Sequence, residues 1–411
     1  MPKRSLRALS AAAIVASIAD AAERWSDADF PPRVRATEAI QTRLGYSTPV
    51  VEYALDRIFF SLRADALSAA IADELGSLAA LDGPVDRPGR PASWARGVDR
   101  VAIVSSDSTI GVALVPAVYA LAAKCDVLVK DRNDALVRAF FLSLAEERPE
   151  FAAAAVARDW RGGADPDEAG VLGRADAVVA FGSDPALRAI RAQLRADARF
   201  VAFGHRASVG FVQLAEIPAR RREALLDAIA TDALLYDGEG CLSLHALFVA
   251  GDASATAALA TDLAAAFERV SIEFPPGTAD DPQRAAALAA YRNLGAFRAA
   301  GGRGAIYAPV RATAAIAFDP PRDAPPPLLP RVLPVFPVAG PEDAVAYLRA
   351  QHVPVMAVGV SDPAAPAALR FAEAIGAVRI ARLGEMQAPP VGGHHGGAPR
   401  IADFVRWIDR E

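Results

Sequence analysis

The first 82 residues show the spacing of amphipathic helices. In the stretch 50–82, "VVEYALDRIFFSLRADALSAAIADELGSLAALD", apolar residues recur every three or four positions with charged residues between them. The next segment, "GPVDRPGRPASWARG" from Gly83 to Gly97, lacks this period and is rich in proline and glycine. This composition favours a loop or a domain entry, so an N-terminal helical region precedes the rest of the chain.

From residue 100 onward, short apolar runs alternate with helical patterns. The runs "RVAIVSS", "DVLVK", "DAVVAFGS" and "RFVAFG" are typical of buried strands, and stretches such as "LVPAVYALAAK" and "DPALRAIRAQLRA" separate them. Strands that alternate with helices of this length predict βαβ units and a parallel sheet covered on both faces. The second half repeats this texture from "HALFVAG" to "AVRIARL", which predicts a second α/β layer.

A proline-dense segment interrupts the second half. The stretch 319–334, "DPPRDAPPPLLPRVLP", fits an extended crossing segment or a disordered linker, and composition does not choose between them. The fold class is therefore α/β with two parallel-sheet layers.

Composition and charge narrow the function classes. The chain has 411 residues, 53% of them hydrophobic, which is ample for two cores. A net charge of -5 gives no basic surplus for nucleic acid or anionic lipid. Its two cysteines, Cys125 and Cys241, are too far apart for a zinc motif and indicate no disulfide framework. We expect a protein of a reducing compartment, located in the cytoplasm.

The N-terminus partly imitates a signal peptide. The start "MPKRSLRALSAAAIVASIADAAERW" combines basic residues with an apolar stretch, but that stretch is alanine-rich and continues into charged residues at helical spacing. An N-terminal helix is the preferred interpretation, with export as the alternative. No later run reaches the roughly 20 apolar residues of a spanning helix, so we expect no membrane insertion.

Cys241 is the first candidate for chemistry. It lies in "YDGEGCLSLHALFV", between glycines and an apolar run. A free cysteine is often a small buried hydrophobe. Here, however, Gly238 and Gly240 allow unusual backbone conformations, and the following strand would hold the loop, which suits a nucleophile. Cys125, at the seam of an apolar helix and a strand, is expected to be a core residue.

Several strand ends carry polar residues. Ligands in open α/β sheets bind at the carboxyl ends of strands, so the loop 105–109 and Lys130 are expected on one rim. Lys130 could instead be merely solvated. Gly182 and Ser183 lie between a strand and a helix whose N-terminus could receive a phosphate, although Ser183 or Asp184 could simply cap that helix.

The histidines give weaker signals. His245 follows Cys241 by four residues, but a strand there would not place the two side chains on one helical face. His205 follows a strand end on the same rim and could approach the thiol. His394 and His395, in "PPVGGHHGG", look like a metal tract, but adjacent histidines cannot easily share one ion. We therefore predict no metal.

Together these segments are similar to a known family. The chain resembles the aldehyde dehydrogenase superfamily and, within it, the acyl-CoA reductases typified by the fatty acid reductase of bacterial bioluminescence. The resemblance rests on the joint order of "RWSDADFPPRVRATEAIQTRLGYSTPVVEYALDRIF", "KCDVLVK", "VAFGSDPALRAIR", "RFVAFGHRASVGFV", "DGEGCLSLHALFV" and a terminal "GEMQAPPVGG" to "FVRWIDRE".

The resemblance implies an aldehyde dehydrogenase-like fold with two Rossmann-like parallel-sheet domains. The domains expected are an N-terminal helical region (1–90), a nicotinamide cofactor-binding domain (91–207), a catalytic domain with the cysteine (208–390) and a C-terminal tail helix (391–411). It also implies a homo-oligomer.

The resemblance further assigns roles to residues. Cys241 matches the nucleophile, Lys130 the lysine that contacts the adenosine ribose, and Gly182 with Ser183 the turn under the pyrophosphate. The expected cofactor-binding set is Ser105, Lys130, Arg132, Gly182, Ser183 and Gly204, and the expected catalytic set is Cys241, Ser108 and His205.

The sequence departs from the superfamily at three places. Ser108, or less favourably Asp107, stands where the superfamily has an oxyanion-binding asparagine, so the Cys241 backbone amide gains importance. Ala202 stands at the position of the general base of hydrolytic members. The glutamate that contacts the nicotinamide ribose would fall near Pro327 and is missing.

A missing base fits a thioester reductase, which never uses water. The sequence thus predicts reduction of acyl-CoA or an acyl carrier thioester to an aldehyde through an acyl-enzyme. NADPH is the expected cofactor, from the family and from Arg132, although Asp131 and Asp134 oppose a 2'-phosphate and NADH is possible. A CoA-acylating aldehyde dehydrogenase working oxidatively on a short acyl group, and a noncatalytic relative, are the alternatives.

Overall fold

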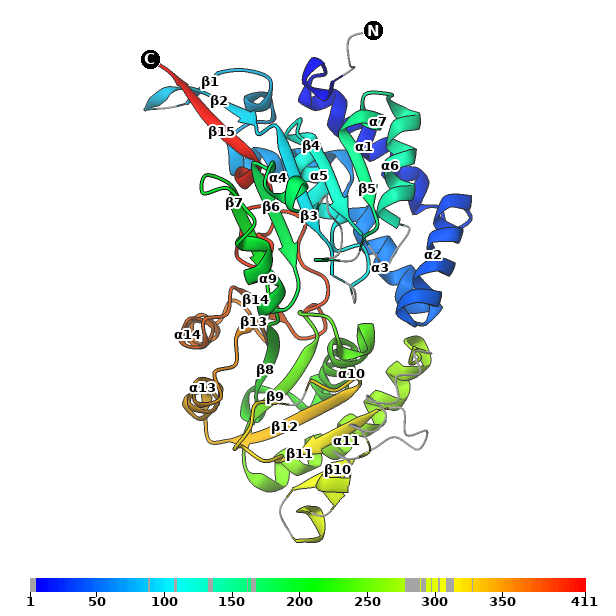
Figure 1. Ribbon diagram of the computed structural model, residues 1–411. Helices are drawn as coiled ribbons and strands as arrows, with labels where there is room; N and C mark the ends of the chain where they lie inside the picture. Colours follow the sequence, from blue (N-terminus) through cyan, green and yellow to red (C-terminus); the bar gives the residue numbers. More distant parts are fainter. Residues whose placement is uncertain are drawn as a thin grey trace. The chain divides into compact units, whose positions relative to one another are not determined.

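The structure of the chain divides into two compact units. The computed structural model describes residues 5–411 except 88, 107–108, 132–135, 161, 164–167, 278–288, 290–292, 297, 302–303, 308–313 and 327. The first unit comprises Met1–Leu44, Val51–Gly204 and Pro390–Glu411, and the second comprises Gly45–Val50 and His205–Pro389 (Figure 1).

Helices form the N-terminal part of the first unit, as the spacing predicts. They are α1 (Ala11–Ser26), α2 (Pro31–Leu44), α3 (Thr48–Ser61) and α4 (Ala64–Leu75). Trp25 of α1 is fully buried, and its ring lies 5.1 Å from that of Phe59 and 6.0 Å from that of Phe140. Its indole N–H donates to Ser143 Oγ at 2.9 Å. These aromatic contacts hold α1 and α3 against α6 (Leu136–Glu147).

A five-stranded parallel sheet forms the centre of the first unit. Its strands are β3 (Arg100–Val104), β4 (Asp126–Lys130), β5 (Ala155–Arg158), β6 (Ala177–Phe181) and β7 (Arg199–Phe203). Its other helices are α5 (Leu114–Ala122), α7 (Phe151–Ala154), α8 (Glu168–Leu172) and α9 (Asp184–Arg191). The order is β5-β4-β3-β6-β7, so the strand order reverses between β3 and β6. Ligands of open α/β sheets bind at such a reversal.

Two segments form strands that the sequence does not predict. The strands β1 (Val85–Arg87), β2 (Arg90–Gly97) and β15 (Val405–Arg410) form an antiparallel sheet, and β15 runs beside β2 in Figure 1. The expected loop at Gly83–Gly97 and the expected C-terminal helix are therefore wrong. A short isolated helix is unstable in water, whereas pairing with β2 satisfies the backbone of β15. A hydrogen bond from Ser93 Oγ to Asp409 Oδ1, at 2.7 Å, supports this pairing.

The second unit contains a seven-stranded sheet in the order β10-β11-β12-β9-β8-β13-β14. Its strands are β8 (Ala207–Gln213), β9 (Leu244–Ala250), β10 (Ala305–Tyr307), β11 (Ala315–Phe318), β12 (Val332–Val338), β13 (Val355–Val360) and β14 (Arg379–Arg382). Among the described strands of this sheet, β10 pairs antiparallel with β11 and the other pairs are parallel. Its helices are α10 (Arg222–Leu234), α11 (Ala253–Glu273), α13 (Pro341–Ala350) and α14 (Pro366–Ile375). The second predicted α/β layer is thus confirmed.

The central strand β9 lies in the core of the second unit. All of its residues are buried. Phe248 of β9 stacks on Phe336 of β12 with ring centres 5.2 Å apart, and Tyr347 of α13 packs against both rings. Burial on both faces explains why β9 is a continuous apolar run, and it gives the residues just before the strand a rigid support.

Short 3-10 helices complete the described elements. They are η1 (Leu6–Ala8), η2 (Leu78–Leu81), η3 (Leu214–Glu216), η4 (Ala219–Arg221), η5 (Leu235–Gly238) and η6 (Ala402–Phe404). The proline-dense stretch connects β11 to β12, which begins within it at Val332. Among the described residues, no helix has the length and apolar character needed to cross a lipid bilayer.

Candidate functional site

The structure distributes the predicted site residues over both units. The first unit contains Ser105, Lys130, Gly182, Ser183 and Gly204, and the second contains His205 and Cys241. Outside the described residues lie Ser108 and Arg132, together with Asp107, Asp134 and Pro327. The predictions for these five residues therefore stay predictions.

The carboxyl ends of β3 and β6 flank the point where the strand order reverses. Ser105 and Ser106 follow β3, and Gly182 and Ser183 follow β6. The N–H of Ser105 donates to the carbonyl oxygen of Lys130 at 3.0 Å, which continues the ladder to the end of β4. The Ser106 hydroxyl is buried and has no hydrogen-bond partner in the described part of the chain. An unsatisfied buried hydroxyl is unfavourable, so this rim is suited to a polar ligand.

Lys130 is fixed at the end of β4 rather than simply solvated. Its side chain is 11% exposed, and Nζ lies 3.4 Å from Glu168 Oε1. The other carboxylate oxygen of Glu168 accepts the N–H of Gly163. The Trp160 ring centre lies 5.5 Å from Nζ, and its indole N–H is buried without a partner among the described residues. This lysine therefore lies beside a second polar group that a ligand could satisfy.

Sequence reasoning missed Glu168 and Trp160. The available signal is "DWRGG", residues 159–163, which directly follows β5 at a third strand end of the same sheet. The backbone here passes close to the lysine head, because a Cβ at Gly162 would lie 2.8 Å from Lys130 Nζ. An aromatic residue followed by two glycines at a strand end thus marks a place where a side chain and a ligand come close to the backbone.

The start of α9 forms the next part of this rim. Ser183 is its N-cap residue, and its side chain makes no capping hydrogen bond. The interpretation of Ser183 as a simple cap is therefore not supported. Gly204, at the end of β7, lies close to this helix start, because a Cβ there would be 2.9 Å from Asp184 Oδ1. The N-terminal amides of such a helix are suited to an anionic group.

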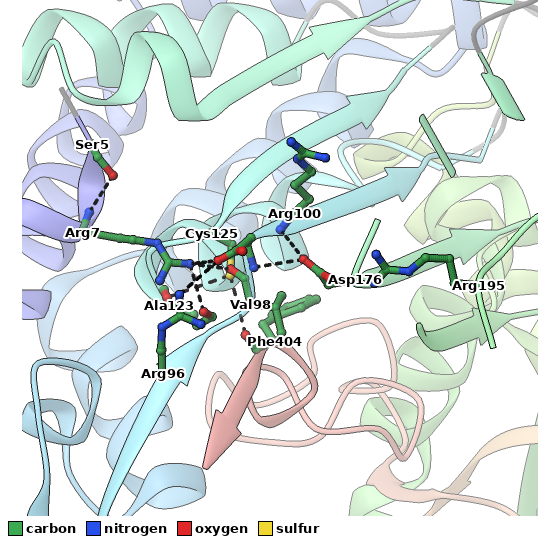
Figure 2. Close-up of polar contacts among 12 residues, drawn as sticks. Ser5, Arg7, Arg96, Val98, Arg100, Ala123, Cys125, Asp176, Arg195 and Phe404 are labelled. Carbon is green, nitrogen blue, oxygen red and sulfur yellow. Dashed lines mark hydrogen bonds and ion pairs between the residues drawn. The ribbon is translucent and has the colours of Figure 1, made fainter. Parts of the chain in front are cut away.

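Cys125 lies in the core of the first unit. Figure 2 shows its Sγ close to the carbonyl oxygens of Ala123 and Phe404, at 3.9 and 3.6 Å. The residue is fully buried, and burial raises the pKa of the thiol. A buried, protonated thiol is a poor nucleophile. The prediction that Cys125 is a core residue is confirmed.

The chain enters the cysteine loop (residues 236–243) through left-handed backbone. Tyr236, Asp237 and Gly238 have φ angles of 56°, 53° and 72°. A Cβ at Gly238 would also lie 2.8 Å from a backbone oxygen, so glycine is required there. Gly240 has no positive φ, so the predicted need for glycine holds at only one of the two positions. Strained backbone costs roughly 1–3 kcal/mol per residue and is found at functional sites.

Arg331 holds this strained entry in place. Its side chain is 4% exposed, and Nη1 lies 3.1 Å from Asp237 Oδ1. The backbone N–H of Arg331 donates to the Asp237 carbonyl oxygen at 2.9 Å, while its side-chain Nη2 donates to Ser271 Oγ at 2.7 Å. Nη1 also donates to the Phe274 carbonyl oxygen at 3.2 Å. A buried cation with this many partners fixes the conformation around it.

Cys241 is the second residue of a tight turn. The N–H of Ser243 donates to the Gly240 carbonyl oxygen at 2.8 Å and closes the turn. Cys241 is exposed, yet desolvation by the surrounding protein raises the pKa of its thiol. The backbone N–H groups of Cys241 and Leu242 and the charge of Arg379 oppose this effect. The thiol is therefore mostly protonated at rest, with donors in place for its thiolate.

Ser208 and His245 contact the cysteine loop from the sheet. The N–H of Ser208 donates to His245 Nδ1 at 3.0 Å, and Ser208 Oγ donates to the Cys241 carbonyl oxygen at 2.7 Å. Both residues are buried. His245 thus holds the backbone of Ser208, and Ser208 in turn holds the Cys241 carbonyl. The sequence did not predict this role.

A second segment supports the end of the loop. Gln387 Nε2 donates to Ser243 Oγ at 2.6 Å. Asp232 of α10 accepts backbone N–H groups within residues 384–386, and burial raises its pKa to about 7. Arg379 donates to carbonyl oxygens of the same segment. These contacts fix Arg379, whose charge acts on the Cys241 thiol.

The other histidines differ in their surroundings. His205 is exposed and lies two residues after the end of β7, and its approach to the thiol stays a prediction. His394 is exposed, whereas the His395 ring stacks on Phe203 at 4.4 Å and lies 5.8 Å from Phe181. Within the described ranges, no group of three or more metal-ligating side chains occurs.

We expect acid to destabilise the first unit through His395. Burial, with a smaller effect of the Arg400 charge, lowers the pKa of His395 to about 4. The unfolded chain takes up this proton near pH 6.5, so the free energy of unfolding falls as the pH drops from 6.5 to 4, by at most about 3 kcal/mol. His395→Phe should reduce this loss in denaturation at neutral and mildly acidic pH. The same loss in variant and wild type would contradict the expectation.

A family model matches almost the whole chain. The model is described as acyl-CoA reductase (LuxC), and it matches residues 6–407. Among curated proteins, no sequence matches this chain.

Solved aldehyde dehydrogenases share the architecture. The NAD-dependent benzaldehyde dehydrogenase of Corynebacterium glutamicum is 16% identical, with a TM-score of 0.70 over 98% of this chain and 87% of that one. The P. syringae indole-3-acetaldehyde dehydrogenase AldA is 16% identical, with a TM-score of 0.72 over 98% of this chain and 85% of that one. An NAD-dependent aldehyde dehydrogenase of Sinorhizobium meliloti is 14% identical, with a TM-score of 0.70 over 99% and 82%. The fold is therefore aldehyde dehydrogenase-like.

Proposed function

Because the chain belongs to the acyl-CoA reductase (LuxC) family of oxidoreductases, we propose that it reduces an acyl thioester to an aldehyde through an acyl-enzyme on Cys241. The observation that carries this proposal is an exposed thiol on a loop whose backbone is fixed by buried contacts. Cys125, the other cysteine, is buried and unsuited to the role. Acyl-CoA or an acyl carrier protein is the proposed acyl donor.

Acylation uses the thiol and the amides around it. The Cys241 thiolate attacks the thioester carbonyl carbon and forms a new carbon–sulfur bond. The negative charge that develops on the carbonyl oxygen needs donors that are already in place, and the backbone N–H of Cys241 is the proposed donor. Collapse breaks the bond to the CoA sulfur, which leaves and takes up a proton. The product is a thioester on Cys241.

A nicotinamide dinucleotide is the proposed cofactor, NADPH first and NADH as the alternative. The rim of the first unit fits such a group. Lys130 with Glu168 would hold the adenosine ribose, the start of α9 would face the pyrophosphate, and Ser106 and Trp160 carry buried polar groups without partners among the described residues. Ser105, Gly182, Ser183 and Gly204 complete the proposed set. When bound, the reduced nicotinamide supplies a hydride.

Neighbours described as NAD-dependent support a nicotinamide cofactor without deciding between the two forms.

Release of the product needs no water. A dehydrogenase that releases an acid needs a base to activate water. By the resemblance, Ala202 of β7 occupies that place, and alanine cannot accept a proton. Reduction of the acyl group leaves a thiohemiacetal alkoxide on Cys241. Its carbon–sulfur bond then breaks, so the aldehyde leaves and the Cys241 thiolate is restored. Exclusion of water then protects the acyl-enzyme.

A panel of acyl-CoAs of different chain lengths, each with NADPH and NADH, tests the proposal. We expect loss of reduced-cofactor absorbance together with equal amounts of aldehyde and free CoA. Oxidation of an aldehyde in the presence of CoA, with no detectable reduction, would favour the acylating dehydrogenase. Cofactor binding without any turnover would favour a noncatalytic relative.

Lys130→Ala is expected to raise the KM for the cofactor about tenfold and to change kcat much less. A ribose contact is made equally in the ground state and the transition state, so its loss weakens binding rather than the chemical step. Steady-state kinetics with varied cofactor measures the split. Lys124→Met is a matched control, because Lys124 pairs with Asp82 elsewhere in the first unit. An unchanged cofactor KM in Lys130→Ala would remove this residue from the site.

A further inference from the structure

β8 and β9 pair irregularly where the cysteine loop joins β9. Ser208 lies opposite Leu244, whereas the next residue of β8, Val209, lies opposite Ala246. His245 is therefore an extra residue on β9, which makes a β-bulge. Bulges redirect a side chain and occur frequently beside active sites. The irregularity here lies four residues after the proposed nucleophile.

The His245 ring takes a hydrogen bond that a regular ladder would give to a carbonyl oxygen. The N–H of Ser208 donates to Nδ1 at 3.0 Å. Nδ1 accepts an N–H only when it carries no proton, so the neutral ring fits this position. Burial acts in the same direction, because it lowers the pKa of His245 to about 4. The ring thus links β9 to the backbone of β8 four residues after Cys241.

Ser208 fixes the peptide that follows Cys241. Its Oγ donates to the Cys241 carbonyl oxygen, and the side chain is completely buried. The Cys241 carbonyl and the Leu242 N–H belong to one planar trans peptide, so they point in opposite directions. A hydrogen bond that fixes the carbonyl therefore fixes the N–H as well. That N–H favours the thiolate, because it opposes the rise in the pKa of the Cys241 thiol.

We propose that Ser208 and His245 are positioning residues for Cys241: His245 holds the backbone of Ser208, and the Ser208 hydroxyl holds the Cys241–Leu242 peptide with its N–H at the thiol. The inference rests on the proposed function of Cys241 as the nucleophile. It concerns the loop before any substrate binds, so it can be tested without turnover. Neither residue reacts with the acyl group.

The test is the pH profile of Cys241 alkylation by iodoacetamide, followed by mass spectrometry of the Cys241 peptide. Cys125 is buried, so the native protein reacts at Cys241. Ser208→Ala removes the hydrogen bond to the carbonyl and leaves the Leu242 N–H free to turn away. We expect the profile to shift upward by about one pH unit, which is about tenfold less thiolate near neutral pH.

Two variants of His245 separate positioning from packing. His245→Leu removes the acceptor for the Ser208 N–H and should shift the profile in the same direction as Ser208→Ala. His245→Asn can offer its side-chain oxygen in place of Nδ1 and should restore a profile close to wild type. If His245→Leu does not fold, the alkylation profile of Ser208→Ala alone tests the proposal.

Thr256→Val is the matched structural control. Thr256 is also fully buried in the second unit, and its Oγ1 donates to the Asp252 carbonyl oxygen at 2.9 Å. Its loss should lower the melting temperature without moving the alkylation profile. A wild-type profile in folded Ser208→Ala, or an equal shift in Thr256→Val, would overturn the proposal.

The same variants are then mixed with acyl-CoA without cofactor, and the rate of adduct formation on Cys241 is measured. We expect Ser208→Ala to form the adduct about tenfold more slowly than wild type at neutral pH. A wild-type protein that forms no adduct would contradict the proposed function, whereas the alkylation profiles would still decide the role of Ser208. Equal adduct rates in wild type and Ser208→Ala would contradict the positioning role alone.

Discussion

Cys241→Ser is expected to lower the rate of acyl-CoA reduction by roughly a thousandfold or more while the chain stays folded. The hydroxyl is nearly isosteric with the thiol, and the residue is exposed, so packing changes little. A serine hydroxyl, however, does not ionise near neutral pH and is a far weaker nucleophile than a thiolate. No donor on the loop can compensate, because the N–H groups of Cys241 and Leu242 act on a charge that no longer forms.

The measurement combines cofactor-dependent reduction with mass spectrometry of the acyl adduct. Cys125→Ser is the matched control, because it makes the same substitution at the buried cysteine. Cys125→Ser should lower the free energy of unfolding, because a hydroxyl replaces a thiol in the core. The reduction rate per folded molecule should equal that of the wild type. Loss of activity in Cys125→Ser, with activity retained in Cys241→Ser, would show that the site assignment is wrong.

Local periodicity predicts most of the two sheets. A parallel strand buried on both faces is an apolar run whatever its neighbours are, so β6 and β9 can be recognised from their own residues. The joint order of such segments indicates the family, and the family model and the aldehyde dehydrogenase-like fold confirm that resemblance. Periodicity fails at β15, where only Val405 is buried and the strand depends on pairing with a distant partner.

The supports of the cysteine loop could not be predicted in the same way. The contact between Ser208 and His245 depends on the register of β8 on β9, and a shift of one residue would remove it. Arg331 lies 94 residues from Asp237 in the chain and reaches it only in the folded unit. The glycine at 238 did give a local signal, because a positive φ restricts the residue type at that position.

The surroundings of the thiol explain why its support matters. Desolvation raises the pKa of Cys241, so any loss of the opposing N–H groups or of the Arg379 charge leaves less thiolate. Ser208, which fixes the Cys241–Leu242 peptide, therefore bears directly on how much thiolate is present.

In the absence of cofactor, acyl-CoA is expected to leave a persistent acyl adduct on Cys241. Acylation should release free CoA in a single burst, and mass spectrometry should find one acyl group on the Cys241 peptide. Because the resemblance puts Ala202 at the position of the base, hydrolysis of this adduct should be at least about a hundredfold slower than its discharge as aldehyde after NADPH is added. Quenched-flow sampling before and after the addition compares the two rates.

Two variants decide whether a missing base causes this persistence. Ala202→Glu should increase hydrolysis if its carboxylate reaches a water about 3 Å from the thioester, which is the geometry that a general base requires. His205→Ala should leave the lifetime of the wild-type adduct unchanged. A neutral imidazole is itself a capable base, and His205 is exposed. Rapid release of free acid from the wild type, abolished in His205→Ala, would therefore identify a hydrolytic enzyme and reject the reductase.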